Sequence, residues 1–134
     1  MTEEENTRIV REIYAAYRER NHAAIVNSFS DVFELHMPGS PDEIPWARTC
    51  RTRQEVAQML DDLSGATEMS PLHVHNFIAK GDQVVALGSS SMRVKNTGHE
   101  FTEHWAMVWT LREGKVTAMR TYYDTRKTAE ALAG

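Results

Sequence analysis

The chain has few of the features that mark secreted, membrane-bound or nucleic-acid-binding proteins. Cys50 is the only cysteine in 134 residues, so no internal disulfide can form, and a lone, inert thiol suits a reducing cytosol. No apolar run approaches membrane-spanning length, and the acidic N-terminus lacks a signal core. Lys and Arg form no basic stripe in a chain of net charge -4, which argues against nucleic acid or anionic membranes as partners. We therefore expect a soluble, cytoplasmic protein.

The remaining composition fits one compact domain. With 41% hydrophobic residues, 134 residues can bury one core and leave no room for a second, so we expect a single domain over residues 1–134. The sequence contains no repeat and no low-complexity tract. Apolar residues with helical spacing predict helices from the Thr2 capping box to about Arg20, from Ala23 to Phe29, and from the Thr52 capping box to Gly65.

Strand patterns dominate the second half of the chain. Alternating residues predict a first strand over Phe33 to Met37, followed by a loop from Ser40 to Arg51 that is long enough to act as a lid. After Pro71 we expect four further strands, at 72–80, 83–95, 100–111 and 116–124, and then a short helical tail. Helices followed by an antiparallel meander are typical of an α+β domain.

The turn between the last two strands decides which side chains share a face. A type I turn with a bulge at Gly114 would place Glu103 opposite Tyr123, Trp105 opposite Thr121 and Met107 opposite Met119. A plain two-residue turn would instead place His104 opposite Tyr123. We favour the bulge, because Glu-Gly suits a type I turn followed by a left-handed glycine.

This order of elements resembles the nuclear transport factor 2-like superfamily, also called the cystatin-like cone or SnoaL-like fold. The local resemblance lies in residues 9–29, Pro38-Gly39, Thr97-Gly98, and Gly114 to Val116 leading to Tyr122-Tyr123-Asp124. The resemblance implies three N-terminal helices packed in a curved antiparallel sheet, with an apolar pocket at the wide end of the cone. It also implies a homodimer through the convex face of the sheet.

The catalytic sets of two related enzyme groups are missing. The positions that resemble the ketosteroid isomerase triad hold Ile13, Met37 and apolar Ala106 or Trp105, since a shift that would use Tyr14 turns the other helix residues away from the core. The positions similar to the limonene epoxide hydrolase charges hold Thr121 and Ser89 to Ser91. Asp124 falls on the face opposite Tyr123, where we expect an ion pair or a cap for the tail helix.

The favoured register predicts one acidic group inside an apolar pocket. That group is Glu103, whose pKa burial would raise towards a range useful for acid-base catalysis, and Tyr123 or Tyr17 would donate a hydrogen bond to a developing oxyanion. The expected substrate-binding residues are Ile13, Tyr17, Met37, Trp46, Trp105, Met107, Met119 and Thr121. Trp46 fits equally a lid over the ligand or a plug for the edge of a partner subunit.

Histidines offer a weaker alternative. His73 and His75 share a strand face and could bind a metal with His99 or His104, but no carboxylate-rich or cysteine motif supports this, so we expect no metal and no organic cofactor. Two functions remain. The first is a cofactor-free isomerase, lyase or cyclase acting on a small hydrophobic carbonyl or cyclic compound, and the second is a non-catalytic ligand-binding or dimerisation domain.

Overall fold

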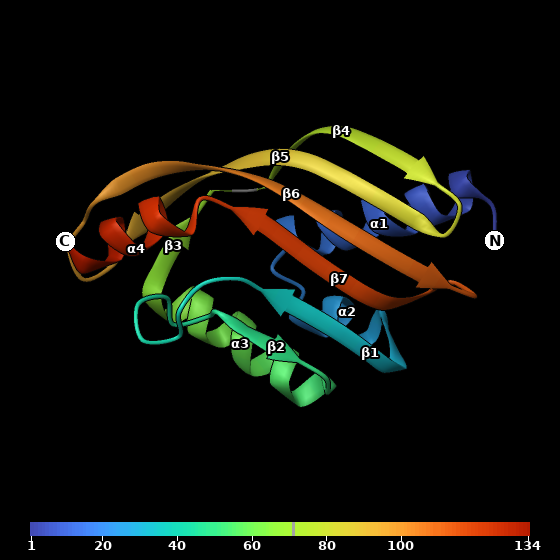
Figure 1. Ribbon diagram of the computed structural model, residues 1–134, viewed down its shortest axis with the longest axis horizontal. Coiled ribbons are helices and arrows are strands. Elements are labelled where there is room, and N and C mark those ends of the chain that lie inside the picture. Colours follow the sequence, from blue (N-terminus) through green and yellow to red (C-terminus); the bar gives the residue numbers. More distant parts are fainter. Residues whose placement is uncertain (71) are drawn as a thin grey trace.

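The protein consists of a strongly bent sheet that wraps around helices (Figure 1). The structure, a computed structural model, describes residues 1–70 and 72–134. The elements run in the order α1 (Glu3–Arg18), α2 (His22–Asn27), β1 (Phe29–Met37), β2 (Arg48–Cys50), α3 (Arg53–Ala66), β3 (Thr67–Met69), β4 (His73–Lys80), β5 (Gln83–Val94), β6 (Glu100–Arg112), β7 (Lys115–Tyr123) and α4 (Thr125–Ala133). This is the expected α+β cone. Pro71, after which the meander was expected to begin, lies outside the described residues.

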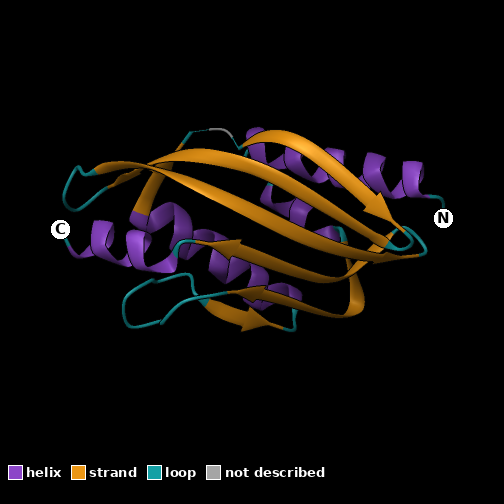
Figure 2. Cartoon of the chain, turned by 45° about the horizontal axis from the view of Figure 1, so that its top comes forward, coloured by secondary structure: helices purple, strands orange, loops and turns teal. Residues whose placement is uncertain are grey.

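The described strands form one sheet in the order β2-β1-β7-β6-β5-β3, and β4 pairs with β5 beside that path. The meander from β4 to β7 is antiparallel as expected, whereas β1 joins β7 in parallel, so the sheet is mixed. Figure 2 shows how the long strands curve over α1 and α3. One end of the molecule holds α4 and the hairpin between β5 and β6, and the N-terminus lies at the other end (Figure 1).

The N-capping residues in the sequence predicted the starts of most helices correctly. Thr2 and Thr52 each form the expected capping box with a glutamate three residues later, and Asn21 accepts a hydrogen bond from the backbone of Ala24. Asp124 caps α4, as expected, by accepting from the backbone N–H of Lys127 at 3.1 Å.

Several boundaries differ from the sequence prediction. The helix expected to end at Gly65 continues to Ala66, and Phe29 starts β1 rather than ending α2. The loop expected to reach Arg51 contains the short strand β2, because Leu35 pairs with Cys50 and Met37 with Arg48. Tertiary pairing overrides local propensity at these places.

The hairpin between β6 and β7 corrects the predicted register. Glu113 and Gly114 both have positive φ, 51° and 81°, as in a two-residue type I′ turn, and the extra residue lies further along, at Thr117. Trp105 therefore pairs with Tyr123, Met107 with Thr121 and Trp109 with Met119. The predicted partners are off by two residues, although β7 does carry one extra residue. Because a shift of two residues keeps every side chain on its own face, the predicted inward face is correct.

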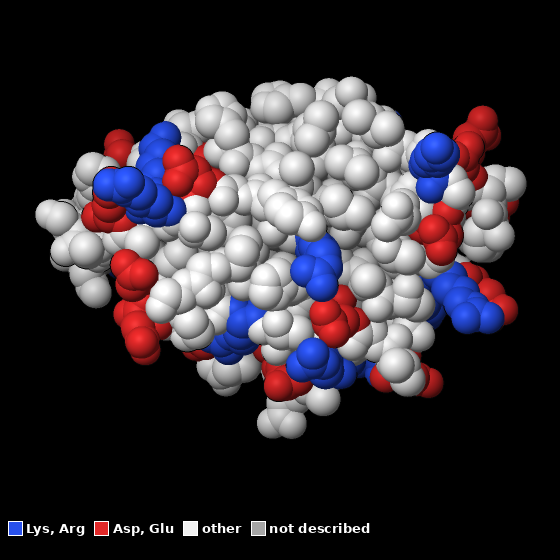
Figure 3. Space-filling model, viewed as in Figure 1, with Lys and Arg blue, Asp and Glu red and all other residues white. Residues whose placement is uncertain are grey.

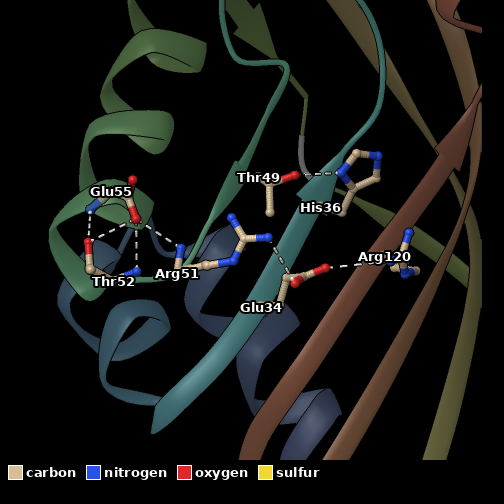
Figure 4. A network of polar contacts seen from close by, with 7 residues as sticks. All are labelled: Glu34, His36, Thr49, Arg51, Thr52, Glu55 and Arg120. Atoms are coloured by element: carbon tan, nitrogen blue, oxygen red, sulfur yellow. Dashed lines mark hydrogen bonds and ion pairs between the residues drawn. The ribbon is translucent and has the colours of Figure 1, made fainter.

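The outer face of the sheet has an uncharged area over the middle of β4, β5 and β6 (Figure 3). Its charges lie mostly towards the edges, and Figure 4 shows one cluster in which Glu34 on β1 lies between Arg51 and Arg120 at 3.3 and 3.5 Å. His36 on the same face contacts Thr49 Oγ1 through its Nδ1 at 2.9 Å. These contacts join β1 to β2 and β7, so we treat the cluster as structural. No helix in the described ranges is both long and apolar enough to cross a membrane.

Candidate functional site

The predicted substrate-binding residues lie on the inner side of the bent sheet or against it. Most are buried in the core, and the others are half-buried. The buried ones are Ile13, Trp46, Trp105, Met107, Met119 and Thr121, and the half-buried ones are Tyr17 and Met37. The buried side chains pack against one another, so they form the floor of the cone rather than the walls of a wide, empty cup.

Glu103 faces inward and is half-buried, whereas its neighbour His104 is exposed on the outer face. The Thr128 hydroxyl of α4 donates to Glu103 Oε2 at 2.7 Å. Burial raises the pKa of Glu103 above its ordinary value, and this effect outweighs the hydrogen bond from Thr128 and the positive charge of Lys127. The structure thus supplies an inward carboxyl group that is more easily protonated than one in water.

Tyr123 lies close to Glu103. Its hydroxyl donates to the backbone oxygen of Pro38 at 2.8 Å. Burial raises the pKa of Tyr123, the negative charge of Glu103 raises it further, and the Trp46 side chain acts in the opposite direction. Glu103, Tyr123 and Trp46 therefore converge beneath α4 and the loop after β1. A crevice of about 370 Å³ runs between those two segments, lined by residues such as Ser40, Ile44 and Ala129, and it does not reach Glu103, Tyr123 or Trp46.

Tyr14 on α1 faces the inner side of the sheet together with Ile13, although the sequence pattern favoured Ile13 alone for this position. Both are buried, and Tyr14 is only 1% exposed. Its hydroxyl accepts a hydrogen bond from Trp109 Nε1 at 3.0 Å and donates to Met107 Sδ at 3.0 Å, while its ring stacks on Trp105. Burial raises the pKa of Tyr14, so it remains a neutral phenol. The four-residue spacing of Val10 and Tyr14 was the available signal for this position.

A cavity of about 280 Å³ opens at the end of the molecule that holds β3. It lies between the C-terminal ends of α1 and α3 and the start of the meander, with Leu60, Leu63 and Leu72 among its lining residues. Tyr17 also lines it, and burial raises the pKa of Tyr17 to about 12. Glu103 and the other predicted residues do not line this cavity. An adjoining groove shares its edge and reaches Phe101, two residues from Glu103 on the same strand face.

The histidines do not assemble a metal centre. The rings of His73 and His75 lie 4.7 Å apart, and His75 Nε2 contacts Ser89 Oγ at 3.2 Å. Within residues 1–70 and 72–134, no group of three or more His, Cys, Asp or Glu side chains could hold a metal ion. Cys50 is buried on β2, where burial raises its thiol pKa to about 11, as befits an unreactive thiol.

The sheet bends around α1, as in cone-shaped α+β proteins, and Glu103 and Tyr123 lie on its inner face. The chain belongs to the family of SnoaL-like domains, whose model matches residues 10–119. An NTF2-like protein from Burkholderia xenovorans LB400 is 32% identical, with 98% of each chain covered and a TM-score of 0.87.

Two further structures share the fold. An NTF2-like protein of unknown function from Burkholderia pseudomallei K96243 is 21% identical over 100% of both chains, with a TM-score of 0.90. TerC, which was co-crystallised with polyporic acid, is 24% identical over 97% of this chain and 99% of its own, with a TM-score of 0.87. Among curated proteins, none matches this chain.

Proposed function

We propose that the protein binds a small hydrophobic carbonyl or cyclic compound and moves a proton on it by acid-base chemistry, without metal or organic cofactor. The observation that carries this proposal is the inward Glu103 carboxyl, whose pKa is raised by burial and whose charge also raises the pKa of Tyr123 on the neighbouring strand. A general base works best when its pKa approaches the operating pH, and burial moves Glu103 in that direction.

The chemistry assigned to the pair is an enolisation. The Glu103 carboxylate takes a proton from a carbon next to the ligand's carbonyl group, and the electron pair of that C–H bond moves to the carbonyl oxygen. Tyr123 donates a hydrogen bond to the resulting enolate oxygen, and protonated Glu103 returns its proton to carbon. The ligand replaces two existing contacts, from Thr128 to Glu103 and from Tyr123 to Pro38, so α4 or the loop after β1 moves when it binds.

The names of several structural neighbours support isomerase or cyclase chemistry as the first to test. One from Rhodopseudomonas palustris is named as a candidate isomerase, and one from Xanthomonas campestris pv. campestris as a candidate polyketide cyclase. TerC carries polyporic acid in its crystals. These neighbours are 12 to 24% identical, which makes them evidence for the fold, and the activity proposed here stands on Glu103 and Tyr123.

A proton-exchange assay tests the proposal before the natural substrate is known. Cyclic ketones and cyclic 1,3-diketones are incubated with the protein in D₂O, and loss of the acidic C–H signals is followed by NMR. We expect at least one probe to exchange faster than in buffer. The variant E103Q should lose roughly 100- to 10,000-fold of that rate, which is the usual contribution of a general base.

E100Q is the matched control, because Glu100 lies on the same strand but is exposed. It should exchange the probe at the wild-type rate. Equal rates for E103Q and the wild type would contradict the proposal. So would a wild-type protein that accelerates exchange of none of the probes.

The alternative is a domain that binds a ligand or a second subunit without chemistry. Two observations favour it, namely the packed floor of the cone and the fact that Glu103 already accepts a hydrogen bond from Thr128. Under this alternative, compounds bind and protect the protein against unfolding, but E103Q and the wild type behave alike in the exchange assay.

A further inference from the structure

We infer that the cavity at the end of α1 binds an amphipathic organic anion, whose carboxylate or similarly acidic group is held by Arg18 and Arg20 and whose apolar body lies against the leucines within. Both arginines line this cavity, at the point where α1 ends. The inference concerns binding at this cavity and does not require Glu103 to transfer a proton.

The first observation is that these arginines lack carboxylate partners. Seven other arginines form ion pairs, each with an aspartate or a glutamate within 4.0 Å. No such pair, within the part of the chain that the structure describes, includes Arg11, Arg18, Arg20 or Arg112. Of these four, Arg18 and Arg20 line the cavity, whereas the Arg11 guanidinium lies over the Phe77 ring, 4.4 Å from its centroid. In a chain of net charge -4, unpaired cations gathered at one opening favour an anionic ligand.

The second observation is the backbone of Arg20. Its φ is 57°, in the left-handed region, although the residue is not a glycine. Its backbone N–H donates to Tyr17 and that of Asn21 to Ala16, so Arg20 occupies the place after the helix where glycine is usual. A non-glycine residue here costs about 1 kcal/mol. Strained backbone positions cluster at ligand-binding and active sites, where the surrounding structure holds them in place.

The other charges around the cavity leave its positive character intact. Glu68 is the one carboxylate among the lining residues, and Arg93 already pairs with it at 3.6 Å. Lys95 adds a third cation and is fixed at the rim, since its Nζ donates to the backbone oxygen of Ser64 at 2.6 Å. A ligand anion would therefore meet three cations and a carboxylate that is already neutralised.

The interior of the cavity determines the size and polarity of the rest of the ligand. Leu60, Leu63 and Leu72 present apolar surface, and the volume of about 280 Å³ lies just below the usual range for small-molecule pockets, roughly 300 to 1,000 Å³. The Tyr17 phenol, with a pKa of about 12, stays protonated at neutral pH and can donate a hydrogen bond. These features fit a compact one- or two-ring acid better than a long chain.

The test compares 2-naphthoate with its uncharged amide, 2-naphthamide, by isothermal titration calorimetry on the full chain. Charge is the main difference between the two probes. We expect 2-naphthoate to bind at least 10-fold more tightly, and the double variant R18Q/R20Q to lose about 10- to 100-fold of the naphthoate affinity while its affinity for the amide changes little.

Arg112 provides the matched control, because it also lacks an ion pair but lies beside the turn between β6 and β7, away from the cavity. R112Q removes one positive charge and should bind naphthoate as the wild type does. R20G should also weaken naphthoate binding, while its relieved backbone raises the unfolding midpoint in urea, which shows that the loss is not misfolding. Equal affinities for the two probes, no measurable naphthoate binding, or wild-type affinity in R18Q/R20Q would overturn the inference.

Discussion

At the scale of single residues, one tyrosine hydroxyl satisfies a deeply buried tryptophan. Trp109 is fully buried, and its indole N–H donates to Tyr14. The variant Y14F removes the acceptor and leaves that N–H unpaired, which should lower the free energy of unfolding by about 1 to 3 kcal/mol. Urea unfolding followed by tryptophan fluorescence measures this difference.

Y17F is the comparison, since within the described residues the Tyr17 hydroxyl has no hydrogen-bond partner and lines a cavity. We expect a change within about 0.5 kcal/mol for Y17F. Equal losses in the two variants would mean that the contact between Trp109 and Tyr14 does not hold the core.

At the scale of elements, the hairpin between β6 and β7 places the inner-face residues. Glu113 holds a positive φ of 51° in its two-residue turn, where asparagine is favoured. E113N should therefore raise the free energy of unfolding by about 0.5 to 1 kcal/mol. E43N removes the same charge from an exposed loop position that lacks a positive φ, and it should change stability little. A destabilised E113N in thermal or urea unfolding would contradict the turn type.

The same hairpin shows what the sequence could and could not predict. Alternation along β6 was sufficient to separate inward Glu103 from outward His104, because a strand has a period of two. The pairing was off by two because the extra residue lies at Thr117 rather than in the turn, and no local signal places a bulge there. An alternating sequence pattern therefore predicts which face of the sheet a side chain lies on more reliably than which residue it pairs with on the next strand.

The site was predictable only in part for a similar reason. Glu103 and Tyr123 could be identified from their strands, but Thr128 reaches Glu103 from a helix 25 residues later in the chain. The cavity at Tyr17 is formed by the ends of separate elements. Its lining includes Leu63 and Leu72, which belong to different elements, so no periodic sequence pattern links them. Such sites depend on tertiary packing.

At the scale of the whole molecule, the outer sheet face is the surface on which we propose dimerisation. Ile78 and Tyr122 are 50% and 56% exposed, and cross-strand pairing places both with Val85, Ala106 and Val108 on one continuous face. This face is uncharged over the middle of β4, β5 and β6 (Figure 3), and Arg120 on β7, the cross-strand partner of Val108, lies at the border of the uncharged area. A contiguous apolar surface of this kind is typical of an interface.

The mass of the protein in solution, measured by analytical ultracentrifugation, tests this prediction. The wild type should sediment with twice the 15.3 kDa mass of the chain, and V108E should sediment as a monomer, because a charge opposite its own copy opposes association. V32E makes the same substitution at a residue that is 84% exposed near the start of β1, a strand that pairs with β2 and β7 rather than with β4, β5 or β6, and it should remain dimeric. A wild-type monomer at tens of micromolar would contradict the proposal.

The proposed chemistry depends on Glu103 being an inward, partly desolvated carboxyl group held by Thr128, and the titration of Glu103 measures this property. The Glu103 carboxyl carbon is followed by ¹³C NMR against pH in the wild type and in T128V. Burial should place the pKa of Glu103 above the ordinary 4.5, and T128V should raise it further, because the lost hydrogen bond favours the ionised form. A midpoint at or below 4.5 that T128V leaves unchanged would contradict the account.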